Sequence, residues 1–259
     1  MEWIDTHAHL TYEGLEDRID DVLARSRTAG VVEWITIGTD RPHCERALRL
    51  ASRIPALWAG LGFHPHYAND IADADLAYLR EALKTERVVA VGETGLDYHY
   101  DNVVKDNQKR LFTAHLDMAA ELQKPVIIHT RDAFDDTMEI LAGYDGKLCD
   151  VVVHCYGGTP EQTRYVLDKG YYVSFTGTVT FKRSDALRRV AAMIPPHRMM
   201  LETDCPYISP EPVRRIQPNE PALLIHTARC LAEIHNLTLE RFAEITTSAA
   251  RAFFRLPHL

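Results

Sequence analysis

The sequence has few of the features that mark a membrane protein, a secreted protein or a protein that binds DNA through bulk charge. No stretch approaches the roughly 18 consecutive uncharged apolar residues of a membrane-spanning helix. The N-terminus, Met1–Asp5, has no basic region followed by an apolar one, which is the pattern of a secretory signal. Positive charge is in deficit, because 29 Lys and Arg stand against 37 Asp and Glu and give a net charge of −8. Sequence-independent affinity for DNA needs many cationic contacts to phosphate, so binding of DNA by bulk charge is not expected. A local basic patch or bound metal ions could still attract a phosphate.

Cysteine is also scarce. The five cysteines are odd in number and form no C-x-x-C pair; they are Cys44, Cys149, Cys155, Cys205 and Cys230. A disulfide framework is not expected in a chain of this length, and reduced, mostly buried thiols fit the pattern better. With no signal and no membrane span, the sequence predicts a cytoplasmic protein that has no membrane partner.

The sequence does contain ample apolar material, and this material alternates regularly. Hydrophobic residues make up 46% of the 259 residues. Eight short apolar runs are each followed by a longer amphipathic stretch. Such runs are typical of parallel strands buried on both faces. They are Trp3–His9, Val31–Gly38, Ala56–Gly62, Val88–Glu93, Pro125–His129, Val151–Cys155, Tyr171–Phe175 and Met199–Thr203.

The stretches between these runs have helical spacing. Apolar stripes run over Leu15–Leu23, which is followed by Gly30 as a C-cap, over Leu111–Leu122 and over Leu223–Ile234. One or two additional helices are predicted over Thr238–Phe254. The alternation predicts an α/β protein with one domain over residues 1–259, a (β/α)8 TIM barrel with extra C-terminal helices, and we expect a monomer. A doubly wound open sheet is the alternative, but it would normally carry a glycine-rich phosphate loop after its first strand.

Polar side chains stand at the ends of five predicted strands. His7 and His9 point to the same side of the first strand, because successive side chains alternate. The other four are Glu93, His129, His154 and Asp204. A lone His-x-His is as consistent with a surface pair, but in a barrel all six positions converge on the C-terminal face, where such enzymes place their sites. Imidazole and carboxylate ligands suit Zn, Mn or Fe(II), and carboxylate-rich sites also take Mg.

The number of these side chains predicts two cations. Six ligands are too many for one tetrahedral catalytic ion with an open position. They suit two divalent ions that share a carboxylate, and Glu93 is the natural bridge because its strand lies between the two ligand groups. Ions about 3.5–4 Å apart can clamp the attacking and leaving oxygens of a phosphoryl transfer.

Seven motifs, in order along the chain, link the sequence to a known family. They are Asp5–Leu10 (DTHAHL), Gly62–His66 (GFHPH), Gly92–Tyr98 (GETGLDY), Pro125–Arg131 (PVIIHTR), His154–Gly158 (HCYGG), Glu202–Tyr207 (ETDCPY) and Asn219–Pro221 (NEP). The sequence resembles the TatD family of metal-dependent deoxyribonucleases within the amidohydrolase superfamily, over essentially the whole chain. It departs from the family pattern at His115, where Gln is common, at Ser248, where Asn is usual, and over Pro210–Pro218. These departures spare the metal ligands and bear on substrate preference.

The resemblance implies a (β/α)8 fold and cleavage of phosphodiester bonds in DNA, single-stranded or at 3′ ends, in the manner of a 3′-to-5′ exonuclease. It implies one cation on His7, His9 and Asp204, a second on His129 and His154, and contact of Glu93 with both. The cations would be Mg, Mn or Zn. His64 and His66 would line the mouth near the substrate. The expected reaction is attack by a water that the metals activate, with Asp204 as general base.

Cations and aromatic residues after the strand ends are candidates for holding a nucleic-acid strand. Arg131 follows His129 with the same face parity, so it fits a phosphate ligand about as well as a solvated surface charge. Lys182, Arg183 and Arg215 are further candidates for binding phosphate, but solvated surface charge fits Lys182 and Arg215 better. The aromatic stretch Tyr98–Tyr100 could stack on a base or pack under a loop.

Two other functions stay open from the residues. The same binuclear site could hydrolyse a small-molecule ester, amide or phosphoester, or an aminoacyl ester of tRNA, because fold and metals do not fix the substrate. A non-catalytic binding protein on a retired barrel would be expected to have lost ligands, and all six are present.

Overall fold

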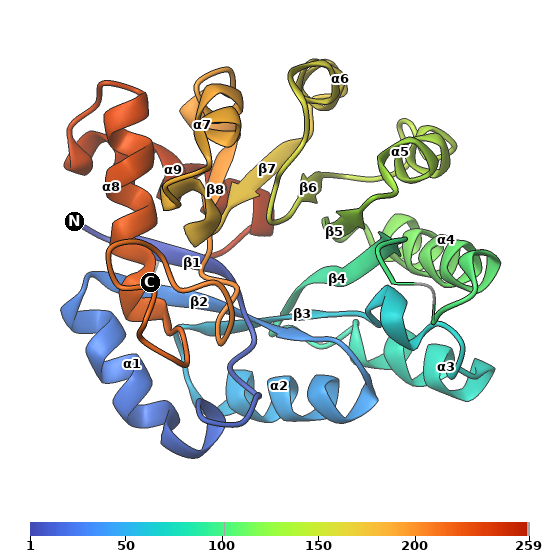
Figure 1. The fold of residues 1–259 in the computed structure, drawn as a ribbon. Helices are drawn as coiled ribbons and strands as arrows, with labels where there is room; N and C mark the ends of the chain where they lie inside the picture. Colours follow the sequence, from blue (N-terminus) through green and yellow to red (C-terminus); the bar gives the residue numbers. More distant parts are fainter. Residues whose placement is uncertain (101, 258–259) are drawn as a thin grey trace. The chain divides into compact units, whose positions relative to one another are not determined.

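The computed structural model describes residues 1–100 and 102–257, in which eight strands alternate with helices (Figure 1). The strands are β1 (Trp3–Ala8), β2 (Val31–Gly38), β3 (Leu57–Leu61), β4 (Val88–Asp97), β5 (Val126–Arg131), β6 (Val151–Val153), β7 (Tyr172–Phe175) and β8 (Met199–Leu201). The helices are α1 (Ile19–Thr28), α2 (Arg41–Arg53), α3 (Asp73–Ala82), α4 (Lys105–Leu122), α5 (Phe134–Ala142), α6 (Pro160–Asp168), α7 (Asp185–Ala191), α8 (Leu224–Ile234) and α9 (Leu239–Phe254). Each apolar run predicted as a strand is therefore confirmed. None of the helices in the described residues is long and apolar enough to cross a membrane.

The chain divides into two compact units. The terminal unit comprises Met1–Thr36 and the chain from Cys155 onward, and the central unit comprises Ile37–His154. In the terminal unit β1 pairs with β2 and β7 pairs with β8, in both cases in parallel. In the central unit β3, β4, β5 and β6 pair in sequence, again in parallel. Parallel pairing requires a crossover between consecutive strands, which the intervening helices provide.

The helices begin and end at residues that satisfy their terminal backbone groups. The Asp40 side chain accepts a hydrogen bond from the His43 amide, 2.8 Å away, at the start of α2. Thr159 and Gln162 form a reciprocal capping box at the start of α6. Gly30 follows α1 with a φ of +90°, a left-handed conformation that suits glycine, as its predicted C-cap role requires.

Helix α9 is the additional C-terminal helix, and it packs within the terminal unit. Phe242 on α9 lies against Trp3 on β1, with ring centroids 6.5 Å apart. Arg251, farther along α9, donates from Nε to the buried Glu33 carboxylate of β2 at 3.0 Å. The segment after Thr238, predicted as one or two helices, is thus a single helix.

Strand β4 is longer than its apolar run predicts. The prediction that this strand ends at Glu93 is wrong, because Gly95 and Asp97 still pair with His129 and Arg131 of β5. The approach of the two backbones depends on glycine. A Cβ on Gly95, whose φ is +142°, would lie 2.0 Å from the His129 carbonyl oxygen. The extension brings Asp97 into the buried part of the central unit.

Candidate metal centre

In the terminal unit, two histidines and one aspartate form the first cluster, which we call the terminal cluster. Oδ1 of Asp204 lies 3.1 Å from Nε2 of His9 and 3.7 Å from Nε2 of His7. The backbones of the two segments hold this arrangement, since the Asp204 amide donates to the His7 carbonyl (2.9 Å) and the His9 amide donates to the Cys205 carbonyl (2.8 Å). Asp204 has a φ of +52°, and residues in this left-handed conformation concentrate at functional sites.

Two buried carboxylates that sequence reasoning missed lie near the terminal cluster in the sequence, and each accepts hydrogen bonds within the terminal unit. Asp5 accepts hydrogen bonds from the amide and the hydroxyl of Thr203, at 3.0 and 2.6 Å. Burial raises the pKa of Asp5 to about 7 against these bonds, which favour its charged form. Glu202 accepts from the Cys155 amide at 2.7 Å. Both lie beside predicted ligands within the quoted motifs, so an acidic residue inside an otherwise apolar strand was the available signal.

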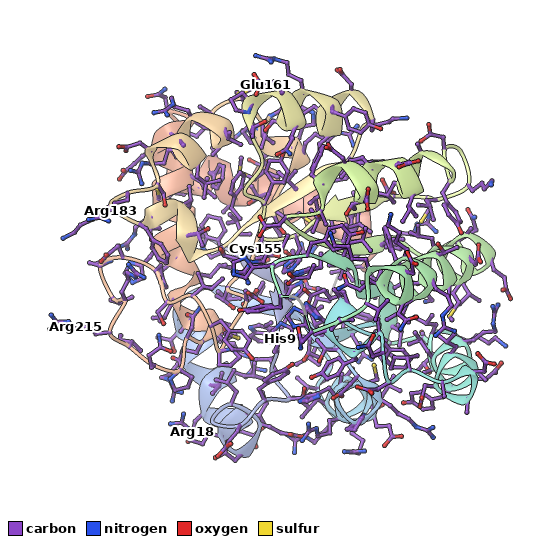
Figure 2. The ribbon with its side chains drawn as sticks, turned by 45° about the vertical axis from the view of Figure 1, so that its right-hand side comes forward. His9, Arg18, Cys155, Glu161, Arg183 and Arg215 are labelled. Carbon is purple, nitrogen blue, oxygen red and sulfur yellow. The ribbon has the colours of Figure 1, made fainter. Side chains whose placement is uncertain are left out.

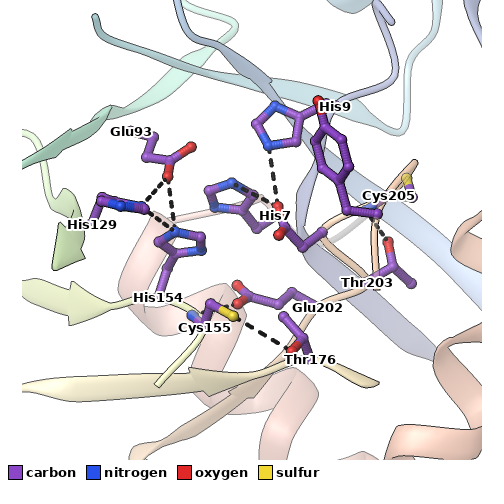
Figure 3. A network of polar contacts seen from close by, with 12 residues as sticks. His7, His9, Glu93, His129, His154, Cys155, Thr176, Glu202, Thr203 and Cys205 are labelled. Carbon is purple, nitrogen blue, oxygen red and sulfur yellow. Dashed lines mark hydrogen bonds and ion pairs between the residues drawn. The ribbon is translucent and has the colours of Figure 1, made fainter. Parts of the chain in front are cut away.

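In the central unit, four side chains form the second cluster, the central cluster. Oε1 of Glu93 lies 2.8 Å from Nδ1 of His129 and 2.9 Å from Nε2 of His154, as the dashed lines in Figure 3 show. The same oxygen lies 3.5 Å from Nε2 of His64, which follows β3. His64 was predicted to line the mouth, and the structure brings it close enough to Glu93 to count as a candidate ligand.

Both clusters have the spacing that a metal ion requires. Ligand atoms about 2.0–2.2 Å from one ion lie about 3–3.5 Å from each other in tetrahedral or octahedral geometry. The contacts within the clusters range from 2.8 Å to 3.7 Å. Donor atoms of His7, His9 and Asp204 all lie within 4.8 Å of one another, as do those of His64, Glu93 and His129. The residues present therefore fit a divalent cation in each unit.

At Glu93 and His64, the electrostatics of the central cluster favour the protonation states of metal ligands. Burial opposes ionisation of Glu93, but the neighbouring His154, His64 and His129 hold the pKa of its carboxyl well below its usual range. Burial lowers the pKa of His64 well below its ordinary value, so its imidazole is neutral near pH 7. An ionised carboxylate and a neutral imidazole are the forms that bind cations.

Asp97 is a functional candidate that sequence reasoning missed. It lies at the end of β4 and is 2% exposed, and its Oδ2 is 3.1 Å from Nε2 of His129 and 2.9 Å from Nε2 of His66. The available signal was strand alternation. Asp97 stands four positions after Glu93, so the two side chains lie on the same side of a continuous strand, and both reach His129. The predicted mouth residue His66 is thus tied to the central cluster through Asp97.

Near this cluster an exposed aromatic and cationic surface forms around Tyr100. The ring of Tyr100 is half-exposed and lies 5.3 Å from the ring of His66 and 5.3 Å from the Arg131 guanidinium carbon. Tyr98 packs instead, since its hydroxyl donates to Asp136 at 2.7 Å and the Lys105 ammonium lies over its ring. The aromatic stretch Tyr98–Tyr100 was expected either to stack on a base or to pack under a loop. Tyr98 is packed, whereas Tyr100 is exposed.

In the terminal unit, the loop after β8 presents cations to solvent. Arg215 is exposed, as is Arg183 on the loop that follows β7, and both point outward in Figure 2, whereas His9 is buried. Asn219 holds together the two ends of the loop after β8, because its side-chain amide donates to the Thr203 carbonyl at 2.9 Å and to the carbonyl of Tyr207.

Comparisons with known proteins agree with this description. The family model described as TatD related DNase matches residues 4–255. The chain is 38% identical to the uncharacterized metal-dependent hydrolase YabD of Bacillus subtilis, over 97% of this chain and 98% of that one. It is 34% identical to a protein of Erwinia billingiae named 3′-5′ ssDNA/RNA exonuclease TatD, over 98% and 99% of the two chains. The crystal structure of YjjV, a TatD homologue of Escherichia coli K12, matches with a TM-score of 0.93, 31% identity and 98% coverage of each chain. With its eight parallel strands and their helices, the chain has the (β/α)8 barrel fold.

Proposed function

The chain belongs to the TatD family of metal-dependent hydrolases, and from that premise we propose that it is a nuclease that removes nucleotides from the 3′ end of single-stranded DNA. The observation that carries the proposal is the buried Glu93 carboxylate, with the nitrogen atoms of three imidazoles 2.8–3.5 Å away. Each cluster would hold one divalent cation, Mg, Mn or Zn. That Glu93 contacts both cations stays a prediction, as do one domain over residues 1–259, a monomer and a cytoplasmic location.

The proposed chemistry divides between the cations and the side chains. When bound, divalent cations stabilise negative charge on phosphoryl oxygens and acidify water. Glu93, His64, His129 and His154 would hold one cation, and His7, His9 and Asp204 the other. The Asp204 side chain retains 14% exposure, more than those of His7 and His9, so it can accept the proton of the attacking water as general base.

The surface around Tyr100 supports nucleic acid as the substrate class. A half-exposed phenol ring offers a face on which any base can stack, and the Arg131 guanidinium beside it can pair with a phosphate. In a chain of net charge −8, attraction for the strand has to come from such local cations and from bound metal. The Erwinia billingiae relative carries the name of an enzyme with this substrate class.

The test is a metal and substrate panel. Purified protein is analysed for metal content and assayed on single-stranded DNA, duplex DNA, RNA, simple phosphodiesters and small carboxylic esters, with and without chelator. We expect chelator-sensitive release of mononucleotides from the 3′ end of single-stranded DNA. Glu93→Gln should lower the rate by at least about 100-fold, whereas the exposed control Glu45→Gln should not.

Two results of this panel would contradict the proposal. Cleavage confined to small esters would assign the site to a small-molecule hydrolase. Cleavage of DNA that persists after complete removal of metal would remove the proposed role of the two clusters.

A further inference from the structure

The candidate histidine ligands differ in which ring nitrogen faces a carboxylate of their own cluster. Four of them direct Nε2 there, namely His7, His9, His64 and His154. His129 directs Nδ1 toward Glu93, at 2.8 Å, and toward Nε2 of His154, at 3.3 Å. Its own Nε2 points to Asp97 instead.

Asp97 is held firmly at the far side of this ring. Its backbone amide donates to Oε1 of Gln108 at 2.8 Å, and its backbone carbonyl accepts from Nε2 of the same side chain at 2.8 Å. Its Oδ1 accepts from the His99 amide at 2.9 Å, which leaves Oδ2 for His129 and His66. Gln108 is 1% exposed, so the side chain that holds the backbone of Asp97 is itself buried.

We propose that Asp97 is the positioning residue of the central cluster, which holds His129 as the Nε2–H tautomer and so directs the Nδ1 lone pair toward a cation. An ionised carboxylate only accepts hydrogen bonds, so the Nε2 atoms that face it must carry protons. A neutral imidazole has one N–H, and with that proton on Nε2 the other nitrogen is a ligand. A carboxylate behind a ligating imidazole also raises its basicity, and losing such a partner typically lowers metal affinity about 10–100-fold.

The burial of Asp97 and the contacts of its carboxylate agree with this role. Asp97 is 2% exposed, and its two oxygens face nitrogen atoms of His99, His129 and His66 at 2.9–3.1 Å. The inference rests on the proposed binding of a cation by the central cluster, and it adds that the orientation of His129 is imposed by Asp97.

The chain offers a matched control for the experiment. Asp132 and His99 form a carboxylate–imidazole pair of the same kind, with a separation of 2.9 Å, on neighbouring segments of the same unit. That pair is exposed, and His99 belongs to neither cluster. Asp132→Asn therefore changes a carboxylate beside an imidazole and leaves the Asp97 carboxylate itself in place.

The experiment measures metal binding rather than activity. Zinc stoichiometry and affinity are determined by competition with a chromophoric chelator for wild type, Asp97→Asn, Asp97→Ala and Asp132→Asn. We expect wild type to bind two zinc ions. Both Asp97 variants should bind one of the two about 10–100-fold more weakly, with the other unchanged, and Asp132→Asn should match wild type. Long-range ¹H–¹⁵N spectra of the zinc-loaded wild type should show His129 protonated at Nε2.

The outcomes separate this inference from the proposed function. Absence of zinc binding by wild type would contradict the proposed function. If both Asp97 variants bind two zinc ions with wild-type affinity, the proposed role of Asp97 is overturned. The same follows if their zinc affinity falls equally at both sites. Neither result would contradict the proposed function. The ¹H–¹⁵N spectra are recorded on wild type, so this test does not depend on whether a variant folds. A His129 ring protonated at Nδ1 in the zinc-loaded protein would also overturn the role of Asp97.

Discussion

His115 allows a quantitative test of how a buried neutral imidazole supports the central unit. It lies on α4 and is fully buried, and both of its ring nitrogens are used. Nδ1 donates to the Leu111 carbonyl at 2.8 Å, and Nε2 accepts from the Phe63 amide at 2.9 Å. Burial lowers the pKa of His115 from 6.5 to about 4, against the bond to Leu111, which raises it. Phe63 directly precedes His64, so this bond also anchors the segment that carries a candidate ligand.

The lowered pKa predicts a dependence of stability on pH with a definite sign. Because His115 binds a proton less readily when folded, its contribution is complete above the unfolded pKa of 6.5 and is lost as pH falls toward 4. The unfolded and folded pKa values of His115 differ by about 2.5, which corresponds to about 3 kcal/mol in the free energy of unfolding when the effect is complete. Between pH 7 and pH 5, about 2 kcal/mol of the free energy of unfolding should be lost through this one residue.

The assay is urea unfolding of wild type and His115→Gln at pH 7, 6 and 5, in chelator so that metal binding does not contribute. Glutamine can also accept from the Phe63 amide and donate to the Leu111 carbonyl, and it does not titrate. The stability of wild type should fall by about 2 kcal/mol more than that of the variant over this range. Equal pH dependence in the two proteins would refute the assignment of His115 as a buried neutral imidazole.

Three further substitutions test other contacts. Arg131→Gln should raise the KM for single-stranded DNA and reduce the slope of log affinity against log salt by about one, measured from 50 to 200 mM salt. Gly95→Ala should destabilise by more than about 3 kcal/mol or prevent folding, measured as soluble yield and Tm, because its Cβ would meet the His129 carbonyl. Arg251→Met should cost about 3 kcal/mol in urea unfolding, because it removes the guanidinium from the buried Glu33.

Two of these substitutions have a control elsewhere on the chain. Arg164→Gln, at an exposed position of α6, should leave the salt dependence unchanged. Gly146→Ala meets no atom within 4 Å, so it carries only the strain of a φ of +74°. An unchanged salt slope in Arg131→Gln would remove its phosphate role. Full stability in Gly95→Ala or Arg251→Met would contradict the packing of β4 or α9.

The strand order and most of the strand positions could be predicted from the sequence. The run Val31–Gly38 coincides with β2, and the runs that begin at Trp3 and Met199 each begin at the first residue of a strand. Such runs are detectable because a strand buried on both faces must be almost continuously apolar. The predicted C-terminal boundary of β4 was wrong because Thr94 and Gly95 resemble a turn. In the structure their pairing with β5 overrides this local propensity.

The candidate site was only partly predictable, for a physical reason. Residue type and strand position indicate where a histidine stands, and the structure places His129 and His154 beside Glu93 as the pattern suggests. Which ring nitrogen faces a cation depends on the partner of the other nitrogen. That partner, Asp97, is fixed by Gln108 from another element, a tertiary contact that no local pattern contains.

The closure of the Pro206–Asn219 loop has a consequence for how this protein can diverge. The Asn219 side chain donates a hydrogen bond to the Thr203 carbonyl, next to Asp204, and so fixes the C-terminal end of the loop. Arg214 and Arg215 lie at the tip, away from this anchor in the sequence. Because the anchor lies at the base of the loop, we expect chimaeras that exchange only its tip with a relative to keep the arrangement of His7, His9 and Asp204.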